Sequence, residues 1–179
     1  KDSKYLYLEG YLWDSELAKN AFIKAAQIAK LSNTKIILSL SDSFCVDRHR
    51  ESFLELIDNY VDIVFCNKSE VLSLFKKDKL ANCQGDLSSL CELVVVTLGS
   101  NGSLIINKNT IEVIKSITKG KIIDTTGAGD IYAGGFIHGL IKNYSLKKCG
   151  EIGSICAGQI ITQLGSRSNI DFRELIREI

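Results

Sequence analysis

The chain has 179 residues, of which 45% are hydrophobic, and its formal net charge is +1. This length and apolar content suffice for one compact domain with its own core. The near-zero charge gives no support to a nucleic-acid or membrane-surface partner, and no apolar run is long enough to span a membrane. We therefore expect neither nucleic acid nor a membrane among the partners.

The six cysteines contain no C-x-x-C pair and no neighbouring histidine cluster. Structural zinc is therefore not favoured, because its ligands usually come in closely spaced pairs. A disulfide framework is not favoured either, because the chain has ample ordinary core. We expect buried thiols in a reducing cytoplasm.

The first part of the chain alternates short apolar runs with helical spacing of apolar residues. The predicted strands are Tyr5–Leu8, Lys35–Leu40 and Val61–Phe65; helices are predicted from Leu17 to Ala29, from Val46 to Tyr60 and from Ser69 to Phe75. Such an alternation of strands and helices gives a parallel sheet that is covered on both faces.

The second part adds strands at Leu93–Thr97, Ser103–Ile106 and Ile111–Ile114, with hairpin-type turn residues at Leu98–Gly102. The last third is helical, with predicted helices Ala128–Lys142 and Leu146–Leu164 and a short tail from Phe172. No internal repeat or linker interrupts the pattern. The sequence therefore predicts a single α/β domain that closes with an antiparallel edge and packed helices.

Two polar turns follow predicted strands directly. Asn67 comes after the third strand and Gly99 after the fourth. Ligands of parallel α/β sheets bind beyond the carboxyl ends of the strands, so both turns are candidate ligand sites.

The segment Ile122–Phe136, "IIDTTGAGDIYAGGF", places small residues directly before a carboxylate and a predicted helix. The dinucleotide pattern G-x-G-x-x-G fails here because position 132 is Tyr132. The P-loop pattern fails as well, because no glycine is followed by Lys and then Ser or Thr.

The small residues at 127–129 nevertheless favour an anion site. Without bulky side chains, the backbone N–H groups can point into one space, and the following helix adds its positive end. Asp130 fits such a site if it accepts the proton of a hydroxyl that attacks a phosphoryl group. In the alternative interpretation, the glycines only shape the helix entry and Asp130 complements the helix dipole.

Three motifs in this order resemble the ribokinase/PfkB carbohydrate kinase family, which includes adenosine kinases. Asp124–Asp130 with the following Ala133-Gly134-Gly135-Phe136 resembles its C-terminal signature; Asn67-Lys68-Ser69-Glu70 resembles its N-x-x-E motif, and Thr97–Gly102 its T-L-G-x-x-G loop. The resemblance implies a ribokinase-like three-layer α/β/α sandwich, with a mostly parallel sheet and an antiparallel edge, truncated at the N-terminus.

The resemblance also implies a role for each matching position in ATP-dependent phosphorylation of a sugar or nucleoside hydroxyl. Asp130 would be the base, and the amides of Gly127, Ala128 and Gly129 would form the anion hole. ATP would lie against Asn67, Thr97, Gly99, Ser100, Asn101, Gly102 and Gly129. Asn67 and Glu70 would organise Mg²⁺ through water. Asp124, Thr126 and Gly165 would hold a monovalent cation such as K⁺.

The resemblance covers only the C-terminal part of the family's architecture. Residues 1–179 would be the nucleotide-binding and catalytic portion, and the N-terminal portion that grips the substrate is absent. The chain has no Met, not even at position 1, so we expect the natural polypeptide to begin upstream. The missing half of the same protein is then the expected partner, and the fragment alone is expected to phosphorylate substrate poorly. The alternative is a non-catalytic nucleotide-binding module derived from this family.

The segment around Leu40–Arg50 and the glycines of the predicted helix from Ala128 both have a structural interpretation. The segment Leu40–Phe44 with Asp47–Arg50 resembles the adenosine kinase branch, but it also fits a charged helix start with Phe44 and Val46 pointing inward. Gly134, Gly135 and Gly139 each cost about 1 kcal/mol of helix stability relative to Ala. We expect a close approach of this helix to the sheet or to the nucleotide as compensation.

Overall fold

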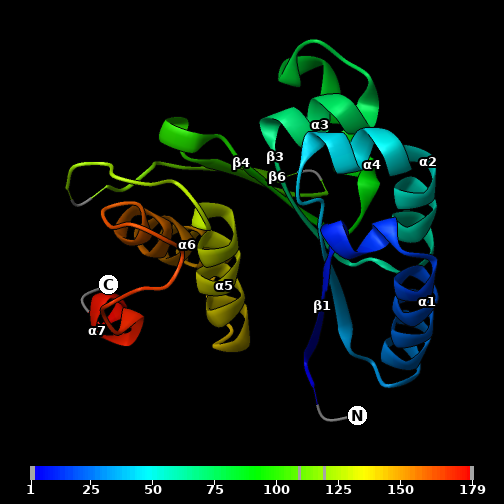
Figure 1. Ribbon diagram of the computed structural model, residues 1–179, viewed down its shortest axis with the longest axis horizontal. Coiled ribbons are helices and arrows are strands. Elements are labelled where there is room, and N and C mark those ends of the chain that lie inside the picture. Colours follow the sequence, from blue (N-terminus) through cyan, green and yellow to red (C-terminus); the bar gives the residue numbers. More distant parts are fainter. Residues whose placement is uncertain (1–2, 109, 119, 178–179) are drawn as a thin grey trace. The chain divides into compact units, whose positions relative to one another are not determined.

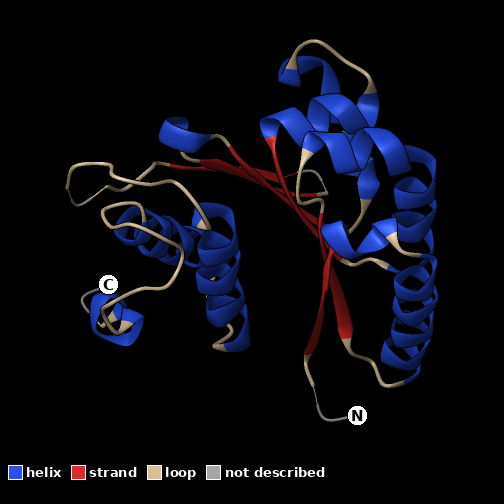
Figure 2. Ribbon diagram, viewed as in Figure 1, coloured by secondary structure: helices blue, strands red, loops and turns tan. Residues whose placement is uncertain are grey.

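The computed structural model describes residues 3–108, 110–118 and 120–177 of the chain. Its strands are hydrogen-bonded in the order β1-β2-β3-β4-β5-β6. The sheet is mixed, mostly parallel with an antiparallel edge, and helices flank it (Figure 2). The strand bounds are β1 Tyr5–Glu9, β2 Lys35–Ser39, β3 Ile63–Asn67, β4 Leu93–Thr97, β5 Ser103–Asn107 and β6 Thr110–Ile114. The predicted fold class is confirmed.

Within the described residues, the fold consists of two compact units. The first holds residues 3–96, 106–108 and 110–111, and the second holds residues 97–105, 112–118 and 120–177. Each unit is described by itself below.

The first unit contains the parallel strands β1, β2 and β3. Leu38 of β2 lies opposite Leu8 of β1 and Val64 of β3, so the three strands are in register. Ile36, Ile37 and Leu38 are consecutive and all fully buried. Consecutive buried residues point to opposite faces of a strand, so both faces of β2 are covered, as the continuous apolar run predicts.

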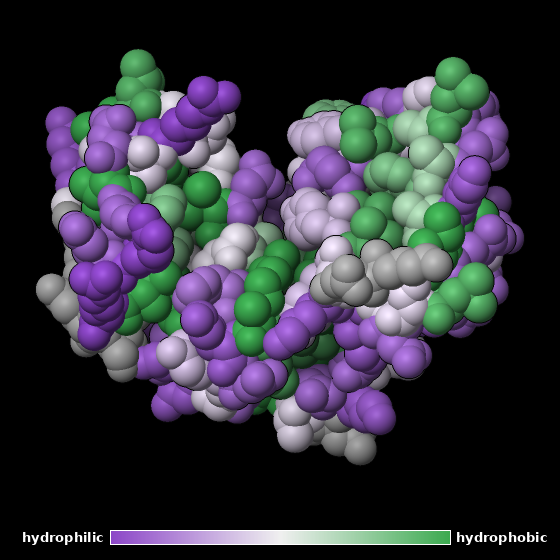
Figure 3. Space-filling model, turned by 90° about the horizontal axis from the view of Figure 1, so that it is seen from below, coloured by the Kyte–Doolittle hydropathy of each residue, from purple (hydrophilic) through white to green (hydrophobic). Residues whose placement is uncertain are grey.

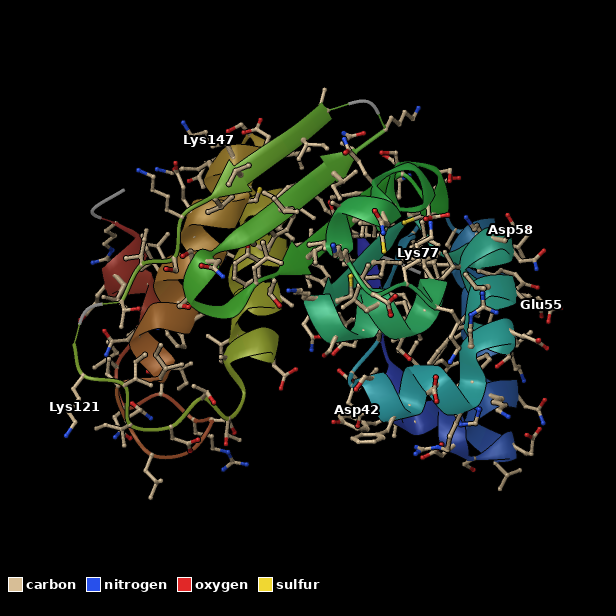
Figure 4. All side chains as sticks on the ribbon, turned by 90° about the horizontal axis from the view of Figure 1, so that it is seen from above. Asp42, Glu55, Asp58, Lys77, Lys121 and Lys147 are labelled. Atoms are coloured by element: carbon tan, nitrogen blue, oxygen red, sulfur yellow. The ribbon has the colours of Figure 1, made fainter. Side chains whose placement is uncertain are left out.

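The helices of this unit are α1 (Glu16–Leu31), α2 (Ser43–Tyr60), α3 (Lys68–Phe75) and α4 (Gln84–Leu90). In Figure 1, α1 and α2 run along the same side of β1. Asp42 lies at the start of α2, and its carboxylate accepts a hydrogen bond of 2.6 Å from the Cys45 amide (Figure 4). The sequence did not predict α4, which is only seven residues long and buries only Leu87. Apolar periodicity cannot be detected over so few buried positions.

The start of α2 corrects one expectation. Val46 is fully buried as predicted, but Phe44 is 76% exposed instead of pointing inward. The two side chains are two positions apart, which corresponds to about 200° around a helix, so they cannot both face the core.

The second unit is dominated by the packed pair α5 (Ala128–Ile141) and α6 (Leu146–Ile160), followed by α7 (Phe172–Ile176). α6 ends four residues before the predicted Leu164. The carbonyl of Ile161, directly after the helix, accepts hydrogen bonds from the amides of Ile123 (2.8 Å) and Asp124 (3.3 Å). The end of α6 is therefore joined to the segment that leads into the glycine loop.

Gly135 and Gly139 of α5 face α6, so the expected approach of these glycines to the sheet or nucleotide is wrong. A Cβ at Gly135 would lie 3.1 Å from the Cα of Gly153, and one at Gly139 would lie 3.0 Å from the Cα of Cys149. Figure 1 shows the two helices side by side. A Cβ at Gly134, in contrast, would meet nothing within 4 Å.

The six cysteines are free thiols, five of them buried and Cys91 partly buried, which confirms the expected buried thiols. Among the described residues, no helix has both the length and the hydrophobicity needed to cross a membrane. Figure 3 shows hydrophobic side chains interspersed with hydrophilic ones on the face seen from below. Scattered exposed apolar residues of this kind are normal for a protein surface.

The different surroundings of two α5 glycines predict opposite effects of the same substitution. Gly134→Ala should raise the free energy of unfolding by up to about 1 kcal/mol, because Ala favours the helix and the added methyl group meets open space. Gly139→Ala gains the same helix propensity but forces α5 away from Cys149, so it should lower stability. Urea unfolding of both variants measures the difference. Equal stabilisation by both would contradict the close packing of α5 on α6.

Candidate functional site

Two loops that are distant in sequence line one pocket of about 230 Å³ in the second unit. Thr97, Gly99, Ser100 and Gly102 come from the first loop, and Ala128 and Gly129 come from the second. The other lining residues are Ser116, Ile117, Thr118, Ile122, Thr125, Tyr132, Ser154, Ala157, Gly158 and Ile161. The structure therefore brings together most of the predicted nucleotide-binding residues. Asn101, Gly127 and Asp130 lie in the same loops but not on the pocket wall.

The first loop is a single 3-10 turn, Gly99–Asn101, between β4 and β5. The Leu98 amide donates to the Gly102 carbonyl at 2.8 Å and closes the turn. Gly102 has φ of +86°, and a Cβ there would lie 1.9 Å from the Ile114 carbonyl oxygen. Only glycine fits both the left-handed conformation and this close approach.

The second loop enters α5 through Gly127, which has φ of +75°. A Cβ at Gly127 would lie 2.5 Å from the Cβ of Ser166, so the loop packs directly on the segment that follows α6. The Ala128 amide, one of the three predicted anion-hole donors, donates to the Thr125 carbonyl at 3.2 Å. Among the described residues, the amides of Gly127, Gly129 and Asp130 have no hydrogen-bond partner. These amides are therefore the donors available to an anion at the positive end of α5.

Asp130 is exposed in the first turn of α5. Within the part of the chain that the structure describes, its carboxylate forms no hydrogen bond or ion pair. A carboxylate without a partner can accept a proton from a bound hydroxyl, which a carboxylate held in an ion pair does poorly.

Asp124 connects the glycine loop to the segment after α6. Its Oδ1 accepts hydrogen bonds from the Thr126 amide (2.9 Å) and hydroxyl (2.7 Å), and its Oδ2 accepts one from the Gly165 amide (2.9 Å). The two bonds from Thr126 and the one from Gly165 hold the pKa of Asp124 below its usual value. All three predicted cation-site residues are thus together, and the carboxylate bridges them by hydrogen bonds.

Asn67 and Glu70 lie in the first unit, at the end of β3 and the start of α3, and form a capping box. The Asn67 Oδ1 accepts from the Glu70 amide at 3.0 Å, and the Glu70 Oε2 accepts from the Asn67 amide at 2.8 Å. The Asn67 Nδ2 donates to the Glu70 Oε1 at 2.5 Å. The motif therefore has a structural role in fixing the start of α3.

Glu70 is only 3% exposed, and burial raises its pKa to about 7. The Asn67 amide opposes this rise, while the nearby negative charges of Asp42 and Glu9 add to it. Both Glu70 oxygens already accept a hydrogen bond, and among the described residues no group of three or more acidic, His or Cys side chains could hold a metal. This donor set is compatible with contact to Mg²⁺ through water, because Mg²⁺ usually keeps several of its water ligands.

The sequence interpretation missed one wall of the pocket, residues 116–118. The buried Ser154 hydroxyl accepts from the Ile117 amide at 3.0 Å and donates to the Lys115 carbonyl at 2.9 Å. A Cβ at Gly158 would lie 1.6 Å from the Ile117 carbonyl oxygen, so α6 lies directly against this wall. Gly150, Ser154, Ala157 and Gly158 recur at helical spacing. This pattern of small residues could have predicted a backbone packed against α6, but not which segment.

Comparison with known proteins gives consistent matches. The profile of the pfkB family carbohydrate kinases matches residues 1–173. A nucleoside kinase of Methanocaldococcus jannaschii is 36% identical over 122 residues. Two solved structures, a probable sugar kinase from Rhizobium etli and an adenosine kinase from Sinorhizobium meliloti, are each 39% identical and superpose with TM-scores of 0.96 over 99% of this chain.

The chain is shorter than these relatives. The match covers 68% of this chain but only 39% of the nucleoside kinase. This chain spans 54% of each of the two solved structures. It therefore corresponds to about half of the proteins that it resembles.

The raised pKa of Glu70 predicts a pH-dependent stability. Between pH 4.5, the ordinary value, and about pH 7, the folded chain binds more protons at this site than the unfolded chain, so stability falls as pH rises. The contribution to this fall is at most on the order of 3 kcal/mol. Glu70→Gln should remove that part of the slope, although it also loses an acceptor of the capping box.

The measurement is urea unfolding at several pH values from 4.5 to 8. Glu51→Gln, which removes one exposed charge from α2, is the matched control. If the parent protein and Glu70→Gln differ by a constant amount across this range, the raised pKa of Glu70 is wrong.

Proposed function

The chain belongs to the pfkB family of carbohydrate kinases, and from this premise we propose that it carries the nucleotide-binding and catalytic portion of an ATP-dependent kinase. The proposed reaction transfers the γ-phosphoryl group of ATP to a hydroxyl of a sugar or nucleoside. The main support is the pocket of the second unit, which unites the Thr97–Gly102 loop with the glycine loop beside the unpartnered amides of α5.

The names of the relatives support the proposed class of phosphoryl acceptor. Their names include nucleoside kinase, ribokinase and adenosine kinase. These names point to a sugar or a nucleoside as the acceptor. We propose the same class here, with the substrate-binding portion supplied by residues of the complete protein outside this chain.

In the proposed mechanism, the Asp130 carboxylate accepts the proton of the acceptor hydroxyl. The hydroxyl oxygen forms a bond to the γ-phosphorus while the bond from that phosphorus to the bridging oxygen of ADP breaks, so the electron pair leaves with ADP. General-base assistance of this kind contributes a factor of roughly 10²–10⁴. The amides of Gly127, Gly129 and Asp130 would stabilise the charge on the transferred group.

Two cations belong to the proposal. Mg²⁺, when bound, neutralises charge on the ATP phosphates, and Asn67 and Glu70 would hold it through water. A monovalent cation would lie at Asp124, Thr126 and Gly165. The hydrogen bonds of Asp124 hold these residues together, so a cation there would bind to residues that are already fixed in place.

The half-length match favours one alternative, a nucleotide-binding module that performs no catalysis. Such a module needs the pocket but has no use for a base at Asp130. The two functions therefore differ in the effect of substituting Asp130.

Asp130→Asn in the complete protein should lower kcat by roughly 10²–10⁴-fold and leave the Kd for ATP within about twofold, because Asn keeps the shape but not the basicity. Steady-state kinetics and calorimetric titration measure the two quantities. Asp171→Asn, at the exposed start of α7, is the control for loss of a carboxylate. An unchanged kcat in Asp130→Asn would refute the base role, whereas a parent protein that binds ATP but shows no turnover would favour the binding module.

Titration of the present chain with ATP tests the nucleotide site directly. We expect saturable binding, and we expect Glu70→Gln to weaken binding of ATP with Mg²⁺ but not of ATP in the presence of a chelator. Equal affinities of parent and variant under both conditions would contradict the metal role of Glu70. No binding by a folded chain would contradict a nucleotide site formed by these residues alone.

A further inference from the structure

A buried pair of hydroxyl groups joins the two loops that line the pocket. The Ser103 Oγ and the Tyr132 hydroxyl oxygen are 2.6 Å apart, and the two residues are 0% and 5% exposed. Ser103 is the first residue of β5 and directly follows Gly102 of the first loop. Tyr132 lies in α5, two residues after Asp130, and itself lines the pocket.

The ring of Tyr132 has little freedom to move. It stacks on Phe136 with the ring centroids 6.3 Å apart. On its other neighbour, α6, a Cβ at Gly153 would lie 2.8 Å from the Tyr132 carbonyl oxygen and 3.2 Å from the ring. A ring held in this way gives its hydroxyl a fixed position, so the bond to Ser103 fixes a distance between β5 and the start of α5.

The hydroxyl groups of Ser103 and Tyr132 are hydrogen-bonded to each other. Burial raises the pKa of Tyr132 to about 12, so the phenol stays neutral and can donate or accept in this bond. Removal of one hydroxyl would leave the other buried without a partner, whereas removal of both would leave an apolar contact of similar shape.

We propose that Tyr132 is a positioning residue for phosphoryl transfer, which acts through Ser103. The pair sets the spacing between the Thr97–Gly102 loop, where the nucleotide would lie, and the first turn of α5, which carries Asp130 and the unpartnered amides. This inference rests on the proposed function. It adds a residue whose role is to hold the two loops at a fixed distance. Neither Tyr132 nor Ser103 belongs to the three sequence motifs.

The test uses four variants of the complete protein: Tyr132→Phe, Ser103→Ala, the double variant and Ser145→Ala. Ser145 caps α6 at its exposed start, so its substitution lowers stability without touching the pocket. The readouts are kcat, the KM for ATP, the Kd for ATP and the melting temperature, with kinetics measured well below every melting temperature. Ser103→Ala leaves Tyr132 unchanged and serves as the second single variant if Tyr132→Phe does not fold.

We expect each single variant to lower kcat/KM for ATP by about tenfold, because the two loops are then held less well in the reactive arrangement. The double variant should recover most of that loss, and Ser145→Ala should lower the melting temperature with unchanged kinetics. The inference is overturned if the single variants lose only stability, as Ser145→Ala does, or if their losses add in the double variant. If the parent protein binds no nucleotide, the proposed function fails and this inference fails with it; if the parent binds and turns over while the single variants match it, only this inference fails.

Discussion

The arrangement of the second unit depends on one carboxylate, Asp124, which bridges two chain segments. It accepts hydrogen bonds from Thr126 on its own side and from Gly165 on the other. The same approach of the two segments places Gly127 against Ser166, so closely that a side chain at position 127 would not fit. Because Gly127 is the N-cap of α5, the bridge holds the start of this helix and its first amides beside the segment that follows α6. The low pKa of Asp124 has the same cause, since its donors stabilise the charged form.

Asn67 and Glu70 show how one motif can have a structural and a functional role. As a capping box, the pair satisfies amides at the start of α3 and positions a buried carboxylate at the end of β3. The same burial that raises the Glu70 pKa makes its charge costly unless a cation is near. A Mg²⁺ ion bound through water would stabilise that charge. The structural bonds of Glu70 therefore support the proposed metal role, because they hold the carboxylate in place before any metal binds.

Local signals in the sequence predicted the fold and the two loops, because both depend on short-range chemistry. Continuous apolar runs predicted β2 and β3, and glycines predicted the turns that require positive φ at Gly102 and Gly127. Contacts between distant segments could not be predicted in this way. The wall held by Ser154 is an irregular segment without a motif, and the partner of the α5 glycines proved to be α6. The spacing N-x-x-E is compatible with a capping box, but the sequence analysis assigned it only a metal role.

Asp130 remains the residue on which the choice between catalysis and simple binding depends. An acidic side chain in the first turn of a helix stabilises the helix by about 0.3–1 kcal/mol through the macrodipole alone. The dipole effect needs no hydrogen bond between the carboxylate and the amides, in contrast to the N-cap Asp42, which accepts one from the Cys45 amide. At α5, the amides of Gly129 and Asp130 and the Asp130 carboxylate all lack a hydrogen-bond partner among the residues that the structure describes. Free amide donors beside a free carboxylate suit a reaction that needs both. The amides can donate hydrogen bonds to an anionic group, and the carboxylate can accept the proton of a hydroxyl.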